Sequence, residues 1–190
     1  MSKTNEKSNQ LIPKNELVIL PLNENHNLSF FKCESSELND FLKNDALIDQ
    51  RNLVNRTNLC FWKDELTGFF SLVADTIETK NVTDGIESYQ YRKYPAIKIA
   101  RLAVDSKYEK SGIGTYLVKV IMGQVISICD NIGCRYLLVD SKIESKGFYE
   151  KFGFKIAEKN KKKDFNPMYL NMQPIIAAIE SSNLDNKNEN

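Results

Sequence analysis

Apolar residues recur along the chain with two periods, one typical of strands and one typical of helices. Alternating or continuous apolar runs predict strands at residues 16–22, 57–63, 66–80, 95–105 and 134–141, and a closing hairpin at 154–159 and 165–173. Apolar residues at helical spacing predict four helices, which begin at Ser36, begin after Gly112, cover 143–152 and cover 174–181. Ser35 or Ser36 is the expected N-cap of the first helix. This order predicts an α/β (α+β) fold with a mixed, mostly antiparallel central sheet flanked by helices.

The chain length of 190 residues favours a single domain. Residues 1–15 and 181–190 are rich in Asn, Lys and Glu and are expected to be disordered tails. We therefore expect one folded domain over residues 16–180, with a loop or short helix at the polar, tyrosine-bearing segment 80–94.

The composition narrows the classes of function. The formal net charge is +1, so nucleic-acid binding would require local clustering of Lys and Arg. No apolar run is long enough to span a bilayer, and we expect a soluble cytoplasmic protein. The four cysteines form no C-x-x-C pair and the single histidine, His26, lies in a polar segment, so no metal site is expected.

Two glycines in KYEKSGIGTYL, residues 107–117, lie between an apolar strand and a predicted helix. A loop that enters a helix presents unpaired backbone N–H groups at the positive end of the helix dipole, and glycine removes the Cβ that would keep a phosphate away. No Lys-Ser/Thr follows Gly114, which excludes a P-loop, and no third glycine completes a dinucleotide fingerprint. Taken alone, the pair is explained almost as well by a tight turn packed against the sheet.

The surrounding sequence adds a family resemblance. The stretch IARLAVDSKYEKSGIGTYLVKVIM, followed by YLLVDSKIESKGFYEKFGF, resembles the GNAT superfamily of N-acetyltransferases. The resemblance implies that acetyl-CoA is the acetyl donor and that backbone groups of Leu102, Ala103 and Val104 hold its pantetheine arm. It also implies that backbone amides hold its pyrophosphate, at Glu109, Lys110, Ser111, Gly112, Ile113 and Gly114. Glu109 departs from the pattern, which has Gln or Arg at this position.

The resemblance places Tyr149, in GFYEKFGF, near the sulfur of the departing coenzyme A. A phenol with a reference pKa near 10 is protonated at neutral pH and can donate a proton to that sulfur. The alternative is an aromatic side chain that only packs, as Phe148 and Phe152 are expected to do. No general base stands out in the sequence.

Two further segments are similar to one GNAT branch: FFKCESSELNDFLKNDALIDQRNLVNRTNLCF and NPMYLNMQPII. That branch contains toxins of toxin–antitoxin pairs that acetylate the amino group of aminoacyl-tRNA. It implies an RNA substrate, an antitoxin partner and, in many relatives, a homodimer. Basic residues expected to flank the active site are Arg51, Arg56, Lys142 and Lys146, with a further lysine run at 161–163.

Two other functions are consistent with these residues. The acceptor could be a small-molecule amine or a protein amine, and a polycationic acceptor would favour an acidic funnel. The fold could also serve as a non-catalytic acyl-CoA-binding module, although Tyr149 and the intact glycine pair argue against this.

Overall fold

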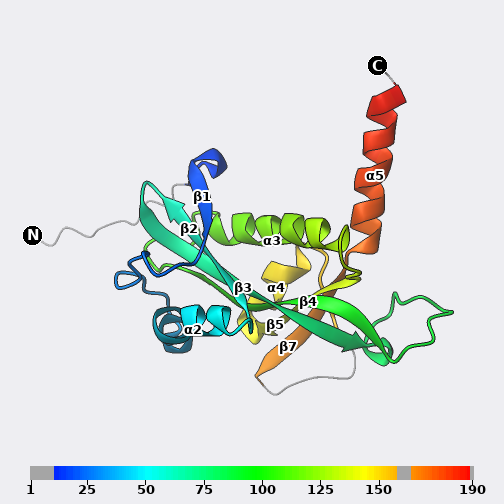
Figure 1. Cartoon of the computed structure of the whole chain (residues 1–190), viewed down its shortest axis with the longest axis horizontal. Helices are drawn as coiled ribbons and strands as arrows, with labels where there is room; N and C mark the ends of the chain where they lie inside the picture. The colour runs from blue at the N-terminus through cyan, green and yellow to red at the C-terminus, as the bar shows by residue number, and fades with distance from the viewer. Residues whose placement is uncertain (1–10, 158–163, 189–190) are drawn as a thin grey trace, which may run out of the picture. The chain divides into compact units, whose positions relative to one another are not determined.

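The computed structural model describes residues 11–157 and 164–188 (Figure 1). Most of the predicted N-terminal tail and the lysine run at 161–163 lie outside these residues. None of the helices in the described part of the chain is long and apolar enough to cross a membrane.

The strands form one sheet in the order β1-β2-β3-β4-β5-β7-β6. Their bounds are β1 Leu17–Pro21, β2 Arg56–Trp62, β3 Glu65–Glu78, β4 Lys93–Val104, β5 Tyr136–Lys142, β6 Lys155–Ile156 and β7 Phe165–Asn171. β4 and β5 pair in parallel, whereas β1 with β2, β5 with β7 and β6 with β7 are antiparallel. The mixed, mostly antiparallel sheet predicted from the sequence is confirmed.

The helices correspond to the predicted helical segments. Their bounds are α1 Ser36–Asp40, α2 Ala46–Arg51, α3 Ile113–Cys129, α4 Lys146–Glu150 and α5 Gln173–Asn188. A π-helical segment, Phe41–Asp45, joins α1 to α2, and short 3₁₀ turns occupy Lys14–Glu16, Thr79–Asn81 and Ile143–Ser145. Ser35 is the N-cap of α1, because its hydroxyl accepts a hydrogen bond from the Leu38 amide at 3.4 Å.

The chain divides into two compact units, and β3, β4 and α3 run from one into the other. The first unit contains residues 11–71 and 101–120, and the second contains residues 72–100 and 121–188. In the first unit, α1, the π-helical segment and α2 bury apolar side chains against β2, β3 and the end of β4. This core consists of Leu22, Phe31, Cys33, Phe41, Leu42, Ala46, Leu59, Phe69 and Ala103.

The core of the second unit is rich in tyrosine. It consists of Ile77, Tyr94, Ala96, Tyr136, Leu138, Ala157 and Tyr169. Three of the tyrosines, on the neighbouring strands β4, β5 and β7, pack edge to face across the sheet. Ring centroids lie 5.3 Å apart for Tyr94 and Tyr136 and 5.5 Å apart for Tyr136 and Tyr169. Figure 1 shows α5 leaving the end of β7, and this helix continues to Asn188, beyond the predicted end at 181.

Candidate active site

The loop that follows β4 is anchored by Asp105, whose side chain is buried. Its carboxylate accepts hydrogen bonds from the backbone amides of Lys32, at 2.8 Å, and Lys107, at 2.9 Å. Its own amide donates to the Thr67 carbonyl at 2.9 Å, and the amide of Ser106 donates to the Lys32 carbonyl at 2.8 Å. These bonds fix the point at which the glycine-containing loop begins.

The loop then turns through two residues with positive φ, Lys110 at 62° and Gly112 at 90°. α3 begins at Ile113, and the first backbone bond across its N-terminus runs from the Tyr116 amide to the Gly112 carbonyl, at 3.0 Å. The amides of Ile113 and Gly114 precede that bond, so the helix itself supplies no acceptor for them. They therefore form a cradle at the positive end of a helix of 17 residues.

The cradle residues fit a diphosphate group. The Ser111 hydroxyl donates to the Tyr108 carbonyl and the Ser111 carbonyl accepts from the Ile12 amide at 3.1 Å, so this serine holds the loop rather than capping α3. At Gly112, a Cβ would stand 3.4 Å from Leu11 and the backbone conformation would be strained. The site therefore presents backbone N–H donors at a turn that favours glycine, which is the arrangement that binds phosphate.

The three predicted pantetheine-binding residues form the end of β4. Ala103 is buried in the core of the first unit, whereas Leu102 and Val104 are half-buried. Close packing at this point depends on Gly68 of β3, where an added Cβ would stand 3.0 Å from the Ala103 carbonyl and 3.2 Å from Leu117. The structure thus places Leu102, Ala103, Val104 and the 109–114 loop consecutively within one unit.

Tyr149 lies on α4 in the second unit and is buried. Its ring packs edge to face with Phe148, at a centroid distance of 5.1 Å, and with Phe154, at 5.5 Å. Burial raises the pKa of the Tyr149 phenol to about 12. The hydroxyl therefore keeps its proton at neutral pH, as a general acid requires, while the ring also packs in an aromatic cluster.

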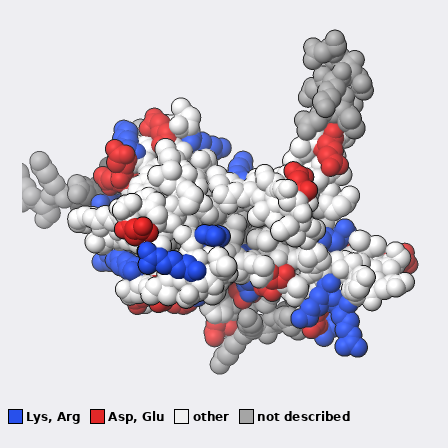
Figure 2. All heavy atoms as spheres, viewed as in Figure 1, with Lys and Arg blue, Asp and Glu red and all other residues white. Residues whose placement is uncertain are grey.

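The four predicted basic residues are divided between the units. Arg51 pairs with Glu24 at 3.3 Å, and Lys146 pairs with Glu150 at 3.2 Å one helical turn away. Arg56 and Lys142 are exposed, at the start of β2 and the end of β5. Figure 2 shows Lys and Arg interspersed with Asp and Glu among the described residues of the face in view.

Residues 60–156 match the family model described as the acetyltransferase (GNAT) domain, a span that covers half of the chain. The chain belongs to the GNAT acetyltransferase family. It is therefore an N-acetyltransferase, and the expected class of enzyme is confirmed. The GNAT match includes the end of β4, the glycine loop and Tyr149.

Known proteins of the same fold include toxins. The chain is 27% identical over 128 residues to the tRNA-acetylating toxin of Mycobacterium tuberculosis (strain ATCC 25618 / H37Rv). The matched stretch covers 67% of this chain and 77% of the toxin. The structure of AtaT complexed with acetyl-methionyl-tRNAfMet matches with a TM-score of 0.77 and 22% identity, covering 86% of this chain and 99% of AtaT. An AtaT mutant bound to the C-terminus of the antitoxin AtaR and acetyl-CoA matches with a TM-score of 0.70 and 21% identity, covering 86% and 98%.

Two residues that shape the GNAT site were not identified from the sequence, Gly68 and Asp105. The signal for Gly68 was an isolated glycine inside the strand-like run LTGFF, which is typical of a close backbone approach. The signal for Asp105 was its place at the end of a strand, where an Asp side chain commonly bonds the backbone two residues onward.

Proposed function

We propose that this chain transfers the acetyl group of acetyl-CoA to the α-amine of an aminoacyl-tRNA, and that it does so in the cytoplasm. The observation that carries the proposal is the similarity to a tRNA-acetylating toxin over two thirds of the chain. The cradle at the start of α3 supports it, because it offers the donors that the diphosphate of coenzyme A requires.

Acetyl-CoA would supply the acetyl group already activated as a thioester. The amides of Gly112, Ile113 and Gly114 would hold its diphosphate, and the backbone of Leu102, Ala103 and Val104 would hold the pantetheine arm. The exposed carboxylate of Glu109 lies beside this cradle in sequence and is offset by the neighbouring Lys110. In this proposal, mostly main-chain groups of the protein bind acetyl-CoA.

Tyr149 would hold the proton that the departing sulfur needs. Its raised pKa keeps the phenol neutral across the physiological range, so the proton is always available at the hydroxyl oxygen. The related toxins KacT and AtaT have been solved with one tyrosine replaced by phenylalanine. The same replacement at Tyr149 tests the role proposed here.

An α-amine suits a site in which no general base stands out. A reference α-amine has a pKa near 8, whereas a lysine side chain has a pKa near 10.4. An appreciable fraction of the α-amine is therefore already neutral and nucleophilic at pH 7 to 8. This chemistry favours an aminoacyl group over a lysine side chain as the acceptor.

We also propose that an antitoxin binds the chain. The related AtaT has been solved bound to the C-terminus of the antitoxin AtaR. The sequence-based expectation of a homodimer stands as a further proposal.

A transfer assay tests the acceptor. The protein is incubated with labelled acetyl-CoA and either charged tRNA, deacylated tRNA, or a small amine such as a polyamine or an amino sugar. We expect label in charged tRNA only, and its loss when the aminoacyl ester is hydrolysed. Label in the small amine without label in charged tRNA would exclude an aminoacyl-tRNA acceptor.

A second acceptor, a small cationic amine, is favoured by one cavity of the first unit. This cavity of about 350 Å³ is lined by the carboxylates of Asp64, Glu65 and Asp105 beside Phe30 and Phe61. Asp105 is already committed to two backbone amides, and Glu65 accepts a hydrogen bond from the Tyr108 hydroxyl at 2.5 Å and pairs with Lys107 at 3.8 Å. Asp64 is therefore the carboxylate of this cavity that would attract a cation. The small-amine arm of the transfer assay decides between the two acceptors.

A further inference from the structure

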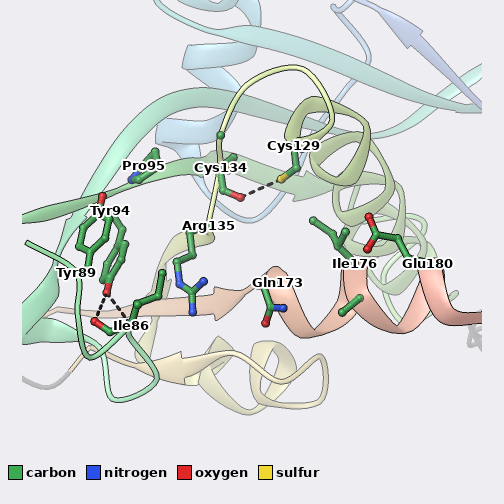
Figure 3. A pocket seen from close by; sticks show the side chains of 12 residues that line it. Ile86, Tyr89, Tyr94, Pro95, Cys129, Cys134, Arg135, Gln173, Ile176 and Glu180 are labelled. Atoms are coloured by element: carbon green, nitrogen blue, oxygen red, sulfur yellow. Dashed lines mark hydrogen bonds between the residues drawn. The ribbon is translucent and has the colours of Figure 1, made fainter. Parts of the chain in front are cut away.

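The second unit contains a cavity that the acetyl-transfer chemistry does not use. It has a volume of about 380 Å³, within the range of small-molecule sites. Its walls come from the segment before β4, the start of β4, the end of α3, the loop that leads into β5 and the first turns of α5. Figure 3 shows Arg135 between Tyr89 and Tyr94 on one side and Gln173 of α5 on the other.

One wall of this cavity is aromatic and rigid. The rings of Tyr89 and Tyr94 stack with a centroid distance of 4.1 Å and an angle of 20° between their planes. The Tyr94 hydroxyl accepts a hydrogen bond from the Ile86 amide at 2.7 Å, which fixes the ring in place. With Ile176 of α5, these residues give a preformed apolar surface whose ordering costs little when a ligand binds.

The positively charged group among the residues that line the cavity is Arg135. Its guanidinium carbon lies 5.6 Å from the Tyr94 ring centroid and 5.7 Å from that of Tyr136, and Nη2 donates to the Asp84 carbonyl at 3.4 Å. Nε is buried and has no acceptor among the described residues. No carboxylate of the described chain forms an ion pair with this guanidinium. The carboxylate of Asp84, whose backbone carbonyl Arg135 contacts, instead binds Lys155 at 2.9 Å and the Tyr136 hydroxyl at 3.1 Å.

We propose that this cavity binds a small organic anion, with its carboxylate or phosphate group on Arg135 and its apolar or aromatic body against Tyr89, Tyr94 and Ile176. A half-buried guanidinium without a carboxylate partner has donors to spare for a fork-shaped acceptor. Glu180 lines the same cavity from α5 and repels a second negative group. The ligand therefore carries its charge at one end only.

This site is separate from the acid proposed for acetyl transfer. The cavity lies where β4 and β5 begin, at Pro95 and Arg135, whereas α4, with Tyr149, follows the other end of β5. The seven residues of β5 span about 23 Å at 3.3 Å per residue. The inference thus stands or falls independently of the proposed acceptor, and the anion should bind whether or not acetyl-CoA is present.

Saturation-transfer NMR on the full chain tests the site with three matched probes: phenylacetate, phenyl phosphate and neutral phenylacetamide. We expect one or both anions to bind and the amide to bind at least tenfold more weakly. Arg135→Met should abolish anion binding, and Arg135→Lys should weaken it because lysine lacks the planar fork. Arg92→Met is the matched control, since Arg92 is an exposed arginine of the same unit outside the cavity, and it should bind as the wild type does.

Thermal melting of each variant shows that it is folded before its binding is read. Equal binding of phenylacetamide and phenylacetate would overturn the role of Arg135, as would retention of binding by a folded Arg135→Met variant. Failure of both anions to bind the wild type would overturn the site itself. Displacement of bound phenylacetate by saturating acetyl-CoA would overturn its separation from the transfer chemistry.

Discussion

Gly112 is the residue on which the cradle geometry most depends, because its φ of 90° lies in a region that L side chains rarely adopt. Gly112→Ala should cost about 1–3 kcal/mol of folding free energy and raise the Kd for acetyl-CoA. The matched control is Gly123→Ala, in the middle of α3 with nothing within 4 Å of the added Cβ, which should gain up to about 1 kcal/mol. Chemical denaturation and calorimetry measure both quantities, and equal effects of the two substitutions would contradict the cradle.

Tyr149→Phe removes one hydroxyl and keeps the ring that packs against Phe148 and Phe154. We expect turnover to fall by about 100- to 10,000-fold, the usual contribution of a general acid, with acetyl-CoA binding unchanged. Steady-state kinetics and calorimetry separate the two effects. Near-normal turnover would leave Tyr149 with a packing role alone.

Asp105→Ala tests the anchor of the loop. It leaves the Lys32 and Lys107 amides without their acceptor, and each lost bond should cost about 1–3 kcal/mol. Asp40→Ala, an exposed carboxylate at the end of α1, is the control and should change stability little. If Asp105→Ala is as stable as the control and binds acetyl-CoA normally, the loop is held by other contacts.

At the scale of single residues, the sequence predicts the role of a residue whose chemistry is distinctive. Gly112 and Tyr149 were identified because a glycine at a helix start and a phenol beside a family motif each have a specific use. The roles of Asp105 and Gly68 were not predicted, because each depends on a partner far away in the sequence. Asp105 binds Lys32, 73 residues away, and Gly68 packs against Ala103, 35 residues away. Pairing across such separations follows from the sheet, which a local pattern does not reveal.

At the scale of elements, Gln50 joins α2 to the strands. Its side-chain amide donates to the carbonyl of Leu22, just after β1, at 2.7 Å. Its side-chain oxygen accepts from the amide of Thr57, at the start of β2, at 3.1 Å. Gln50→Ala should destabilise the protein by about 1–3 kcal/mol per group left unpaired. Hydrogen exchange at Thr57 should accelerate in the variant, and unchanged exchange there would show that α2 is held by apolar packing alone.

The helix predicted from Ser36 onward is present, but its middle is π-helical over Phe41–Asp45. Periodicity indicates a helix without showing this wider turn. Within this segment the adjacent residues Phe41 and Leu42 are both buried, and Ala46 after them is fully buried. The length of α5 was also underestimated, because its last turns are polar and no apolar stripe marks them.

At the scale of the whole molecule, three buried or partly buried tyrosines link stability to alkaline pH. Burial is the largest cause that raises the pKa values of Tyr108, Tyr136 and Tyr149 to about 12, above the unfolded value near 10. Between these values the folded chain binds more protons than the unfolded chain. The free energy of unfolding should therefore be unaffected by these groups below pH 10 and fall as the pH rises toward 12.

Urea denaturation at pH 9 and pH 11 measures this fall. Tyr149→Phe removes one of the linked protons, so the stability of the variant should decrease less than that of the wild type over the same interval. An identical decrease in the two proteins would mean that the Tyr149 phenol ionises as readily in the folded chain as in the unfolded chain.

The structure of the chain in complex with coenzyme A tests the central claim most directly, because the proposed acetyl transfer depends on where the diphosphate binds. We predict that its oxygens accept hydrogen bonds from the backbone amides of Gly112, Ile113 and Gly114 at the start of α3. A diphosphate bound away from this helix start, with these three amides facing only solvent, would contradict the account.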